Sequence, residues 1–267
     1  MREVGILGAS TVGVPVDAEA YRERFANRFR RVGTYVEAAQ LGAAGVLDAH
    51  PGLPRDLAVF IGTGLANLDT IVPLIEAIFH PRAPRCSPLA FARSVGNAAA
   101  FYVAQAFELE GPNVTVSQEE ISFEAALLDA WLAVRSGEVE HALVGGLDVL
   151  VDGDGAQRVR MGAEGVPGTV AAGAAFLLLG AGGPWVLDEV RIGAFDPLDG
   201  VHPEATVLRG WRAGGLEVDG PPVEHRLFGT ASGVRFCEAL NDERFARITH
   251  VQRHREGPWA RISARRR

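Results

Sequence analysis

Apolar residues along the chain fall into short runs and longer stretches with helical spacing. Short apolar runs bounded by turn residues are typical of buried strands, and the longer stretches are typical of helices. We predict strands at residues 4–7, 57–62, 114–117, 141–146, 169–179, 185–195, 247–251 and 259–263. We predict helices at residues 18–31, 36–48, 68–79, 98–108, 121–136 and 233–240. This alternation indicates an α/β protein with a mostly parallel sheet.

The stretch at residues 121–136 is apolar on almost every side. Its apolar residues include Ile121, Phe123, Ala125, Ala126, Leu128, Trp131, Leu132 and Val134. A helix with this pattern must be covered all round. We therefore expect a buried central helix sandwiched between two sheets.

Two segments have features of a membrane span or a targeting signal. The uncharged run at residues 165–187 is long enough to cross a bilayer. A hairpin-type break at residues 180–184, rich in glycine and ending in proline, favours two strands joined by a turn. The first ten residues carry Glu3 and lack the continuous apolar core of a signal peptide. We predict no membrane span. Residues 200–222, rich in glycine, proline and polar residues, are expected to form a loop.

The charged residues and cysteines exclude several classes of function. The chain has 267 residues, with 33 acidic and 26 basic residues and a net charge of -7, which argues against a nucleic-acid partner. Every basic residue is arginine, so Schiff-base chemistry, a pyridoxal-phosphate anchor and a P-loop of the usual form are excluded. Two cysteines, Cys86 and Cys237, form no disulfide framework, which indicates a reducing cytoplasm.

Common cofactor and metal motifs are weak or missing. No Gly-x-Ser-x-Gly elbow occurs, and residues 5–13 lack the glycine spacing of a dinucleotide-binding turn. His250 and His254 could ligate a metal from a helix, but a strand is favoured here and places them with Gln252 on one solvated face. Residues 152–155 have too few ligands for a calcium loop and are expected to form a turn. We predict no cofactor and no metal.

A series of motifs in the first two thirds of the chain is more specific. They are FIGTGLANLDT at residues 60–70, Asn-Ala-Ala at 97–99, Gly-Pro-Asn at 111–113, Val-Ser at 116–117, Arg-Ser-Gly-Glu at 135–138, Gly-Gly at 145–146 and VAAGAAFLLL at 170–179. In this order they resemble the β-ketoacyl synthase family from about residue 3 to 195, and the resemblance resumes weakly at GTASGVRFCEAL and the last two strands.

The resemblance implies the fold and the association of the chain. It implies a thiolase-like layered α/β/α/β/α fold in a single domain over residues 1–267. Its N-terminal half, residues 1–168, would hold the central helix, and the C-terminal half, residues 169–267, would be shortened. In the family one strand pairs across a two-fold axis, so we expect an obligate dimer that uses residues 111–117 and 97–108.

The chain departs from the family at its nucleophile. A Thr-Ala-Cys-Ala-Ser segment of the family supplies the reactive cysteine, and the residues that replace it here are Gln118, Glu119, Glu120, Ile121 and Ser122. Glu120 therefore occupies the nucleophile position. An acyl anhydride on this carboxylate would be a poor substitute for a thioester in carbon–carbon bond formation. Cys86 and Cys237 do not replace the thiol.

Two further catalytic motifs of the family are missing, the His-Gly-Thr motif and the later Lys and Gly-His pair. Those groups stabilise the carbanion and oxyanion of condensation. The reactive cysteine, the His-Gly-Thr motif and the Lys and Gly-His pair are thus all missing. In this respect the chain resembles the chain-length-factor partners of type II polyketide systems. We therefore predict a non-condensing subunit without a confident catalytic residue, which pairs with an active ketosynthase or with itself and works with an acyl carrier protein.

Two alternatives stay open. The chain could be an acyl-thioester decarboxylase, acyltransferase or hydrolase that uses Glu119 or Glu120 as a base, with Ser117, Gln118 and Ser122 beside them. It could also be a self-associated binding protein for an acyl chain or an acyl carrier.

Overall fold

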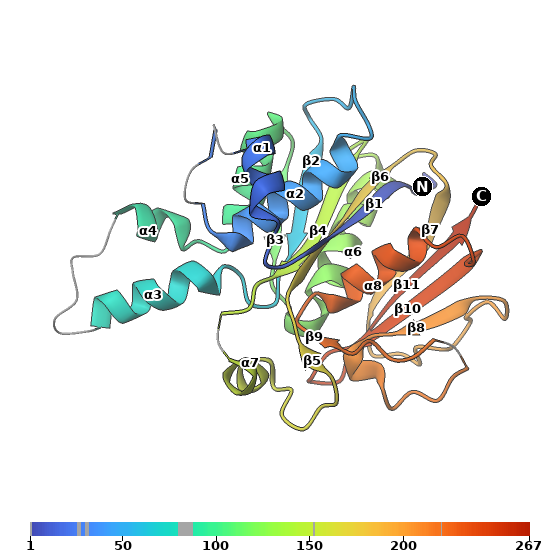
Figure 1. Ribbon diagram of the computed structural model, residues 1–267. Coiled ribbons are helices and arrows are strands. Elements are labelled where there is room, and N and C mark those ends of the chain that lie inside the picture. The colour runs from blue at the N-terminus through green and yellow to red at the C-terminus, as the bar shows by residue number, and fades with distance from the viewer. Residues whose placement is uncertain (1, 26–27, 30–31, 80–87, 152, 220) are drawn as a thin grey trace.

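A nine-stranded sheet runs through the molecule in the order β3-β2-β4-β6-β1-β7-β11-β10-β8 (Figure 1). The computed structural model describes residues 2–25, 28–29, 32–79, 88–151, 153–219 and 221–267. The first half-sheet contains β1 (Gly5–Gly13), β2 (Ala58–Gly62), β3 (Asn113–Val116), β4 (Ala142–Asp148) and β6 (Gly173–Gly180). The second half-sheet contains β7 (Trp185–Gly193), β8 (Thr206–Arg209), β10 (Arg247–Arg253) and β11 (Trp259–Arg266). The short strands β5 (Thr169–Val170) and β9 (Arg226–Leu227) pair separately.

Five of the six predicted helices lie close to their predicted positions. The helix expected at residues 18–31 is shorter, because it ends at Phe25 and residues 28–29 are not helical, while residues 26–27 and 30–31 lie outside the described residues. The α-helices are α1 (Ala18–Phe25), α2 (Thr34–Leu47), α3 (Leu68–Phe79), α4 (Pro88–Arg93), α5 (Ala98–Phe107), α6 (Ser122–Ser136), α7 (Asp154–Met161) and α8 (Ala231–Leu240), with short 3₁₀ turns η1 (Glu119–Ile121) and η2 (Trp211–Ala213). The turn expected at residues 152–155 is wrong from Asp154 onward, because Asp154 begins α7 and pairs with Arg158 at 2.7 Å. Asp152 lies outside the described residues. No described helix is long and apolar enough to cross a membrane.

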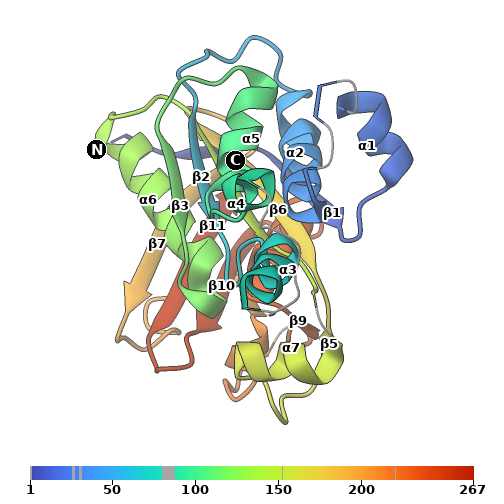
Figure 2. The same ribbon diagram turned by 90° about the vertical axis from the view of Figure 1, so that its left-hand side faces the viewer.

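Alternate residues of the buried strands contribute to two different cores. Leu143 and Leu147 of β4 pack with the cluster under α2 and α5, whereas Ala142 and Val144 pack with the cluster around α6 and α8. This is the two-residue period of a strand covered on both faces. The first half-sheet is therefore covered by α2 and α5 on one side and by α6 and α8 on the other (Figures 1 and 2).

Most of the central helix is buried as expected, but the expectation of cover on every side is wrong, because Leu132 is 49% exposed. Ala126, Leu127 and Ala130 of α6 are fully buried, and α6 contacts β2 and β4 of the first half-sheet as well as β7 and β11 of the second. The two half-sheets are not separate, however. β1 joins them through two residue pairs with β7, Gly5 with Val186 and Ile6 with Trp185. The helix α6 thus packs against both halves of one continuous sheet.

Two expectations about the sheet are wrong. It is mixed, because β2–β3, β2–β4 and β8–β10 are parallel and the other pairings within it are antiparallel. The uncharged run at residues 165–187 does form strands joined by a turn. These strands, β6 and β7, do not pair as a hairpin, because β1 lies between them in the sheet. A hydrophobic pattern predicts which residues are buried in a strand, and it carries no information about which strands pair.

The outer face of the second half-sheet has no layer of α-helices within the part of the chain that the structure describes. Loop residues cover it instead, with Leu198, Val201, Leu216 and Val218 packed around Val207 and Val251. Most of residues 200–222 is therefore loop as expected, but β8 lies inside this stretch and pairs with β10.

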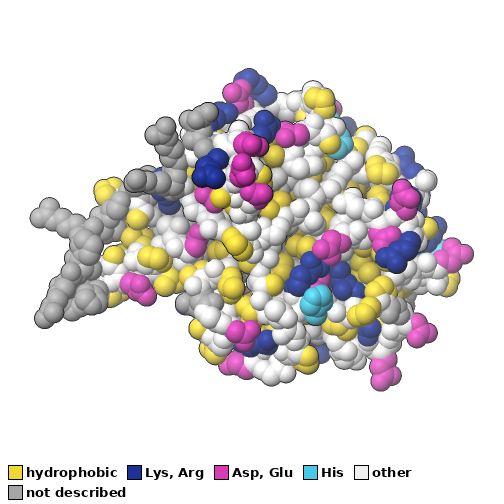
Figure 3. Space-filling view, viewed as in Figure 1, with side chains coloured by type: hydrophobic (Ala, Val, Ile, Leu, Met, Phe, Trp, Pro, Cys, Tyr) yellow, Lys and Arg dark blue, Asp and Glu magenta, His cyan; other side chains and the backbone are white. Residues whose placement is uncertain are grey.

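Helices α3 and α4 project from the body of the molecule (Figures 1 and 2). Large apolar side chains there and on the adjoining α5 are solvent-exposed, namely Ile75, Ile78, Phe79, Phe91, Val95 and Phe101. Figure 3 shows hydrophobic side chains on the surface of this projection. Large exposed apolar side chains on projecting helices are typical of a protein-interaction site.

Candidate functional site

The five residues that are expected to correspond to the family's cysteine segment, residues 118–122, lie where β3 passes into α6. Ser117 and Gln118 are exposed, whereas Ser122 is buried and its hydroxyl donates to the Glu119 carbonyl oxygen at 2.8 Å. The same hydroxyl oxygen accepts from the Gln118 amide at 2.8 Å. Ser122 therefore holds the turn and is not free to react. Glu119 has φ of +49°, a left-handed conformation that costs about 1–2 kcal/mol for a residue with a Cβ atom.

Glu120 is 1% exposed and both of its oxygens are occupied. Its Oε1 accepts from Arg212 Nε at 2.9 Å and lies 3.3 Å from Arg255 Nε. Its Oε2 accepts from the Arg255 backbone amide at 3.3 Å. A carboxylate removed from water to this degree needs such partners, because an unpaired buried charge costs several kcal/mol. The two arginines therefore explain how a glutamate is tolerated at this buried position.

The partners of Glu120 are themselves fixed. Arg212 Nη2 donates to the carbonyl oxygens of Met161 at 2.9 Å and Gly162 at 2.7 Å, and the guanidinium lies 4.6 Å from the centre of the Trp211 ring. Arg255 Nε also contacts Glu119. We call Glu119, Glu120, Arg212, His254 and Arg255 the Glu120 cluster.

His250 and His254, which the sequence analysis considered as possible metal ligands, lie in different environments. His254 lies just after β10 and its Nε2 is 3.3 Å from Glu119 Oε2. His250 is fully buried with Nε2 3.3 Å from Glu124 Oε1 on α6, and Gln252 is also fully buried. The expectation of a solvated strand face is therefore wrong for His250 and Gln252. The reason is that β10 is an internal strand, between β11 and β8, and packs beneath the central helices.

Glu119, Glu120 and His254 bring three possible metal-ligand atoms within 4.8 Å of one another. Arg212 and Arg255 contact the same two carboxylates. Arginine stays protonated in proteins, so these guanidinium groups neutralise the carboxylates that a metal would need. The cluster fits an internal ion-pair network better than a metal site.

The cavity at Glu120 has a volume of about 10 Å³, and Leu65, Met161, Trp211 and Gly229 are among its lining residues. This is about the space of a single water molecule. A Cβ atom on Gly229 would lie 2.8 Å from the Gly64 Cα atom, so the two backbone segments that contain these glycines are in close contact. An acyl group has no room to reach Glu120 in this structure.

Asp148, which the sequence analysis missed, binds the backbone of residues that line this cavity. It is 1% exposed, and its Oδ1 accepts from Thr63 Oγ1 at 3.0 Å and from the Gly64 and Leu65 amides at 2.9 Å. Its Oδ2 accepts from the Thr230 amide at 2.8 Å. Burial raises the pKa of Asp148 to about 6, although these hydrogen bonds oppose the rise. The sequence feature that could have identified Asp148 is its place as an acidic residue at the end of the apolar strand β4.

Neither cysteine supplies a nucleophile here. Cys237 of α8 is fully buried, its Sγ lies 3.7 Å from the Phe176 carbonyl oxygen, and burial raises the pKa of its thiol. A protonated thiol in an apolar environment is unreactive. Cys86 lies outside the described residues.

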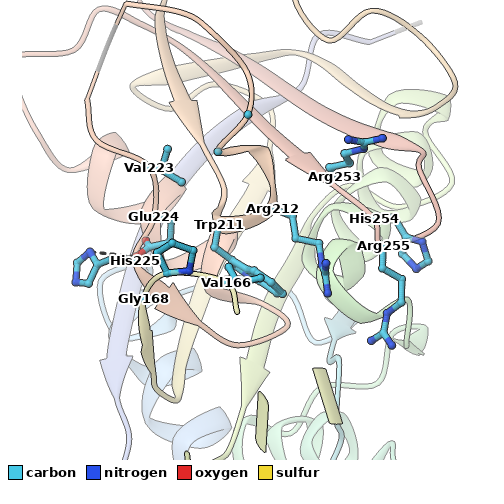
Figure 4. Close-up of a pocket in the computed structure, with 13 residues that line it drawn as sticks. Val166, Gly168, Trp211, Arg212, Val223, Glu224, His225, Arg253, His254 and Arg255 are labelled. Carbon is cyan, nitrogen blue, oxygen red and sulfur yellow. Dashed lines mark ion pairs between the residues drawn. The ribbon is translucent and has the colours of Figure 1, made fainter. Parts of the chain in front are cut away.

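A larger pocket of about 760 Å³ lies next to the Glu120 cluster. Arg212, His254 and Arg255 belong to both the cluster and the pocket lining, and Figure 4 shows how their side chains are arranged. Neither Glu119 nor Glu120 lines this pocket. The space around Glu120 is therefore closed, while a basic pocket beside it is open.

Known structures share this fold at low sequence identity. The chain is similar to the ishigamide ketosynthase/chain length factor, with 17% identity, 99% of both chains covered and a TM-score of 0.77. It is similar to AntDE:AntF, a type II PKS acyl-carrier protein in complex with its ketosynthase, with 12% identity, 100% of both chains covered and a TM-score of 0.77. A β-ketoacyl synthase from Burkholderia phymatum STM815 gives 12% identity, 100% coverage of both chains and a TM-score of 0.73.

These structures confirm the expected thiolase-like layered fold. No curated protein matches the sequence significantly. The family model for the β-ketoacyl synthase N-terminal domain matches residues 18–165, which is more than half of the chain and includes the Glu120 turn and the central helix. The chain belongs to the β-ketoacyl synthase family.

Proposed function

We propose that the chain is a non-condensing, ketosynthase-like subunit of a type II polyketide or fatty-acyl system, which pairs with an active ketosynthase and shapes or stabilises the acyl-chain site. One observation carries this proposal. Glu120, which we assign to the position of the family's nucleophile, is a buried carboxylate bound by two arginines beside a cavity of about 10 Å³. A solved structure with similar fold is a ketosynthase/chain length factor, which supports the proposal.

The geometry is unfavourable for the alternative in which Glu120 is a general base. Such a base must come within about 2.6–3.2 Å of the proton that it removes. Both Glu120 oxygens already accept from protein donors, so a substrate would have to displace Arg212 or Arg255. Glu119 is more accessible, with a side chain that is 41% exposed. The test of the enzyme alternative therefore includes the Glu119→Gln variant.

Pairing through residues 111–117 and 97–108 has structural support. These residues form β3 and α5, which contact each other. β3 is the edge of the nine-stranded sheet and pairs with β2 on one side alone among the described strands. Uncovered strand edges are sites at which proteins pair or aggregate. The exposed apolar residues of α3, α4 and α5 extend the same surface, and a ketosynthase-type interface would bury more than about 2,000 Å².

The direct test is co-expression with a ketosynthase that retains its cysteine and is encoded beside this chain. We expect a one-to-one complex by size-exclusion chromatography and native mass measurement. We expect product formation from malonyl and acyl thioesters to need the partner's cysteine. A chain that stays monomeric at micromolar concentration with and without the partner would overturn the pairing.

A second test asks whether the chain can be given condensing activity. We expect that Glu120→Cys makes no condensation product, because a thiol alone restores neither the missing histidine and lysine motifs nor space for an acyl group. The partner ketosynthase assayed in parallel is the positive control. Turnover of acyl thioesters by the wild-type chain alone, abolished by Glu119→Gln, would replace the proposal with the enzyme alternative.

A further inference from the structure

The pocket beside the Glu120 cluster has the dimensions of a ligand site. Its volume of about 760 Å³ lies within the range of about 300–1,000 Å³ that is typical of small-molecule pockets. Figure 4 shows Arg212, Arg253 and Arg255 on one side of the pocket, Val223 and His225 on the other, and Trp211 between the two sides. The pocket therefore has a basic side, and the opposite side combines Val223 with the polar residues Glu224 and His225.

The basic side presents donors that the protein does not use. Arg253 has no carboxylate within ion-pair distance among the described residues, and its guanidinium lies 5.5 Å from the centre of the Trp259 ring. Arg255 meets Glu119 and Glu120 through Nε, and its two Nη atoms have no acceptor in the described part of the chain. Guanidinium groups with free Nη atoms match the planar oxygens of carboxylates and the oxygens of phosphates.

The one acidic residue in the lining does not oppose an anion. Glu224 is buried, and its carboxylate accepts from Arg226 Nε at 2.9 Å and from Arg226 Nη2 at 2.7 Å. Burial alone would raise the pKa of Glu224, but the hydrogen bonds and the charge of Arg226 outweigh burial and lower it. Glu224 is thus ionised and neutralised by Arg226.

We propose that this pocket binds an organic anion, with its carboxylate or phosphate on Arg253 and Arg255 and its apolar part against Trp211 and Val223. Val166 and Pro167 are further apolar residues of the lining. Burying an apolar group against these residues adds affinity that a bare inorganic anion would not obtain. The proposal goes beyond the pairing function, because it requires neither a partner nor acyl transfer.

The first experiment titrates the full chain by calorimetry with octanoate, octyl phosphate, octanol and inorganic phosphate. We expect at least one of the two amphiphilic anions to bind about 10-fold or more tightly than octanol and inorganic phosphate, because a charge-assisted hydrogen bond contributes about that factor. The tighter of the two identifies a carboxylate or a phosphate as the recognised group. Octanol binding as tightly as both anions, or inorganic phosphate binding as tightly as octyl phosphate, would overturn the proposal.

The second experiment separates the pocket from the rest of the surface. We expect Arg253→Gln to weaken binding of the preferred anion about 10-fold or more. Arg191→Gln is the matched control, because Arg191 is also exposed, lies 4.2 Å from the centre of an aromatic ring and has no carboxylate within ion-pair distance among the described residues. Equal affinities of the two variants would contradict the assignment.

A steric variant tests the same pocket without changing its charge. A Cβ atom on Gly215, which lines the pocket, meets no atom within 4 Å, so Gly215→Trp places bulk there without a backbone clash. We expect this variant to lose binding. Gly155→Trp on α7 is the control, because its Cβ atom is equally unobstructed and the residue is outside the lining. Unchanged binding by Gly215→Trp would overturn the proposal, whereas pairing with a ketosynthase is measured separately and would be unaffected.

Discussion

At Glu120, two guanidinium groups and a backbone amide occupy both oxygens of a buried carboxylate. We expect Glu120→Gln to lower the free energy of unfolding by about 1.5–3 kcal/mol, the contribution of a hydrogen bond to a charged group. Urea denaturation measures this change. Glu140→Gln is the control, because Glu140 is exposed and such surface changes stay within about 0.5 kcal/mol.

The same Gln variant separates a structural role of Glu120 from a catalytic one. We expect the folded variant, once paired, to support product formation at close to the wild-type rate. A general base contributes about 10²–10⁴-fold to a rate, and its amide form removes that contribution. A loss of about 100-fold or more by a variant that is folded and paired under the assay conditions would show that Glu120 is catalytic.

Asp148 gives a prediction about pH. Its folded-state pKa of about 6 lies above the ordinary value of 3.8, so between these values the folded protein binds more protons than the unfolded chain. Stability must then fall as pH rises through this range, by up to about 1.4 kcal/mol per pH unit. We expect Asp148→Asn to flatten this dependence in urea denaturation between pH 4 and pH 6. Asp129→Asn, at an exposed position, should leave it unchanged, and an equal slope in wild type and Asp148→Asn would contradict the assignment.

The sequence predicted part of this site. Glu119 and Glu120 were identified because the family's motifs fix their position in the chain. The arginines that bind Glu120 could not be found in this way, since Arg212 is 92 residues and Arg255 135 residues away along the chain. These ion pairs form because the tertiary fold brings η2 and the end of β10 to the start of α6. A local sequence pattern does not predict such long-range contacts.

At the scale of elements, strongly patterned segments were predicted and weakly patterned ones were missed. α3 lies at residues 68–79 as predicted, because its apolar residues have clear helical spacing. α7 was missed because its eight residues bury two side chains, Gln157 and Met161, and offer no apolar stripe. β8 was missed because four residues within a glycine-rich and proline-rich stretch give no measurable period.

The surface formed by β3 and α5 gives the prediction at this scale. Phe101 of α5 is 55% exposed, and we expect Phe101→Asp to weaken pairing with a ketosynthase about 10-fold or more, since it places a charge in an apolar contact. Leu132→Asp on α6 is the matched control, at 49% exposure and outside the proposed surface. Size-exclusion chromatography over a concentration series measures both. Equal pairing by the two variants would remove α5 from the interface.

For the whole molecule, one hydrophobic cluster connects the two halves of the chain. It includes Val144 and Leu177 from the first half-sheet, Leu208 and Ile262 from the second, and Phe123 from α6. A core shared in this way is expected to unfold as a unit. It supports the proposal that residues 1–267 form a single domain and not two independent halves.

Phe123 tests this unity most directly. It is fully buried, and a Cβ atom on Gly146 of β4 or on Gly233 of α8 would come within 2.7 Å of its ring, so Phe123 fills the space between a strand and a helix from different halves. We expect Phe123→Ala to lower the free energy of unfolding by about 3–5 kcal/mol. Phe91→Ala, at 64% exposure on α4, should change it by less than about 0.5 kcal/mol in the isolated chain.

The form of the transition decides between one domain and two. In a single cooperative unit, the midpoint in urea shifts in Phe123→Ala while the fluorescence of the four tryptophans and the far-ultraviolet circular dichroism change together. Trp131 lies on α6, and Trp185, Trp211 and Trp259 lie in the second half, so fluorescence reports on both halves. If the halves were separate domains, the tryptophan signal and the circular dichroism would have different midpoints, and the shared core around α6 would not be the structure that holds this chain together.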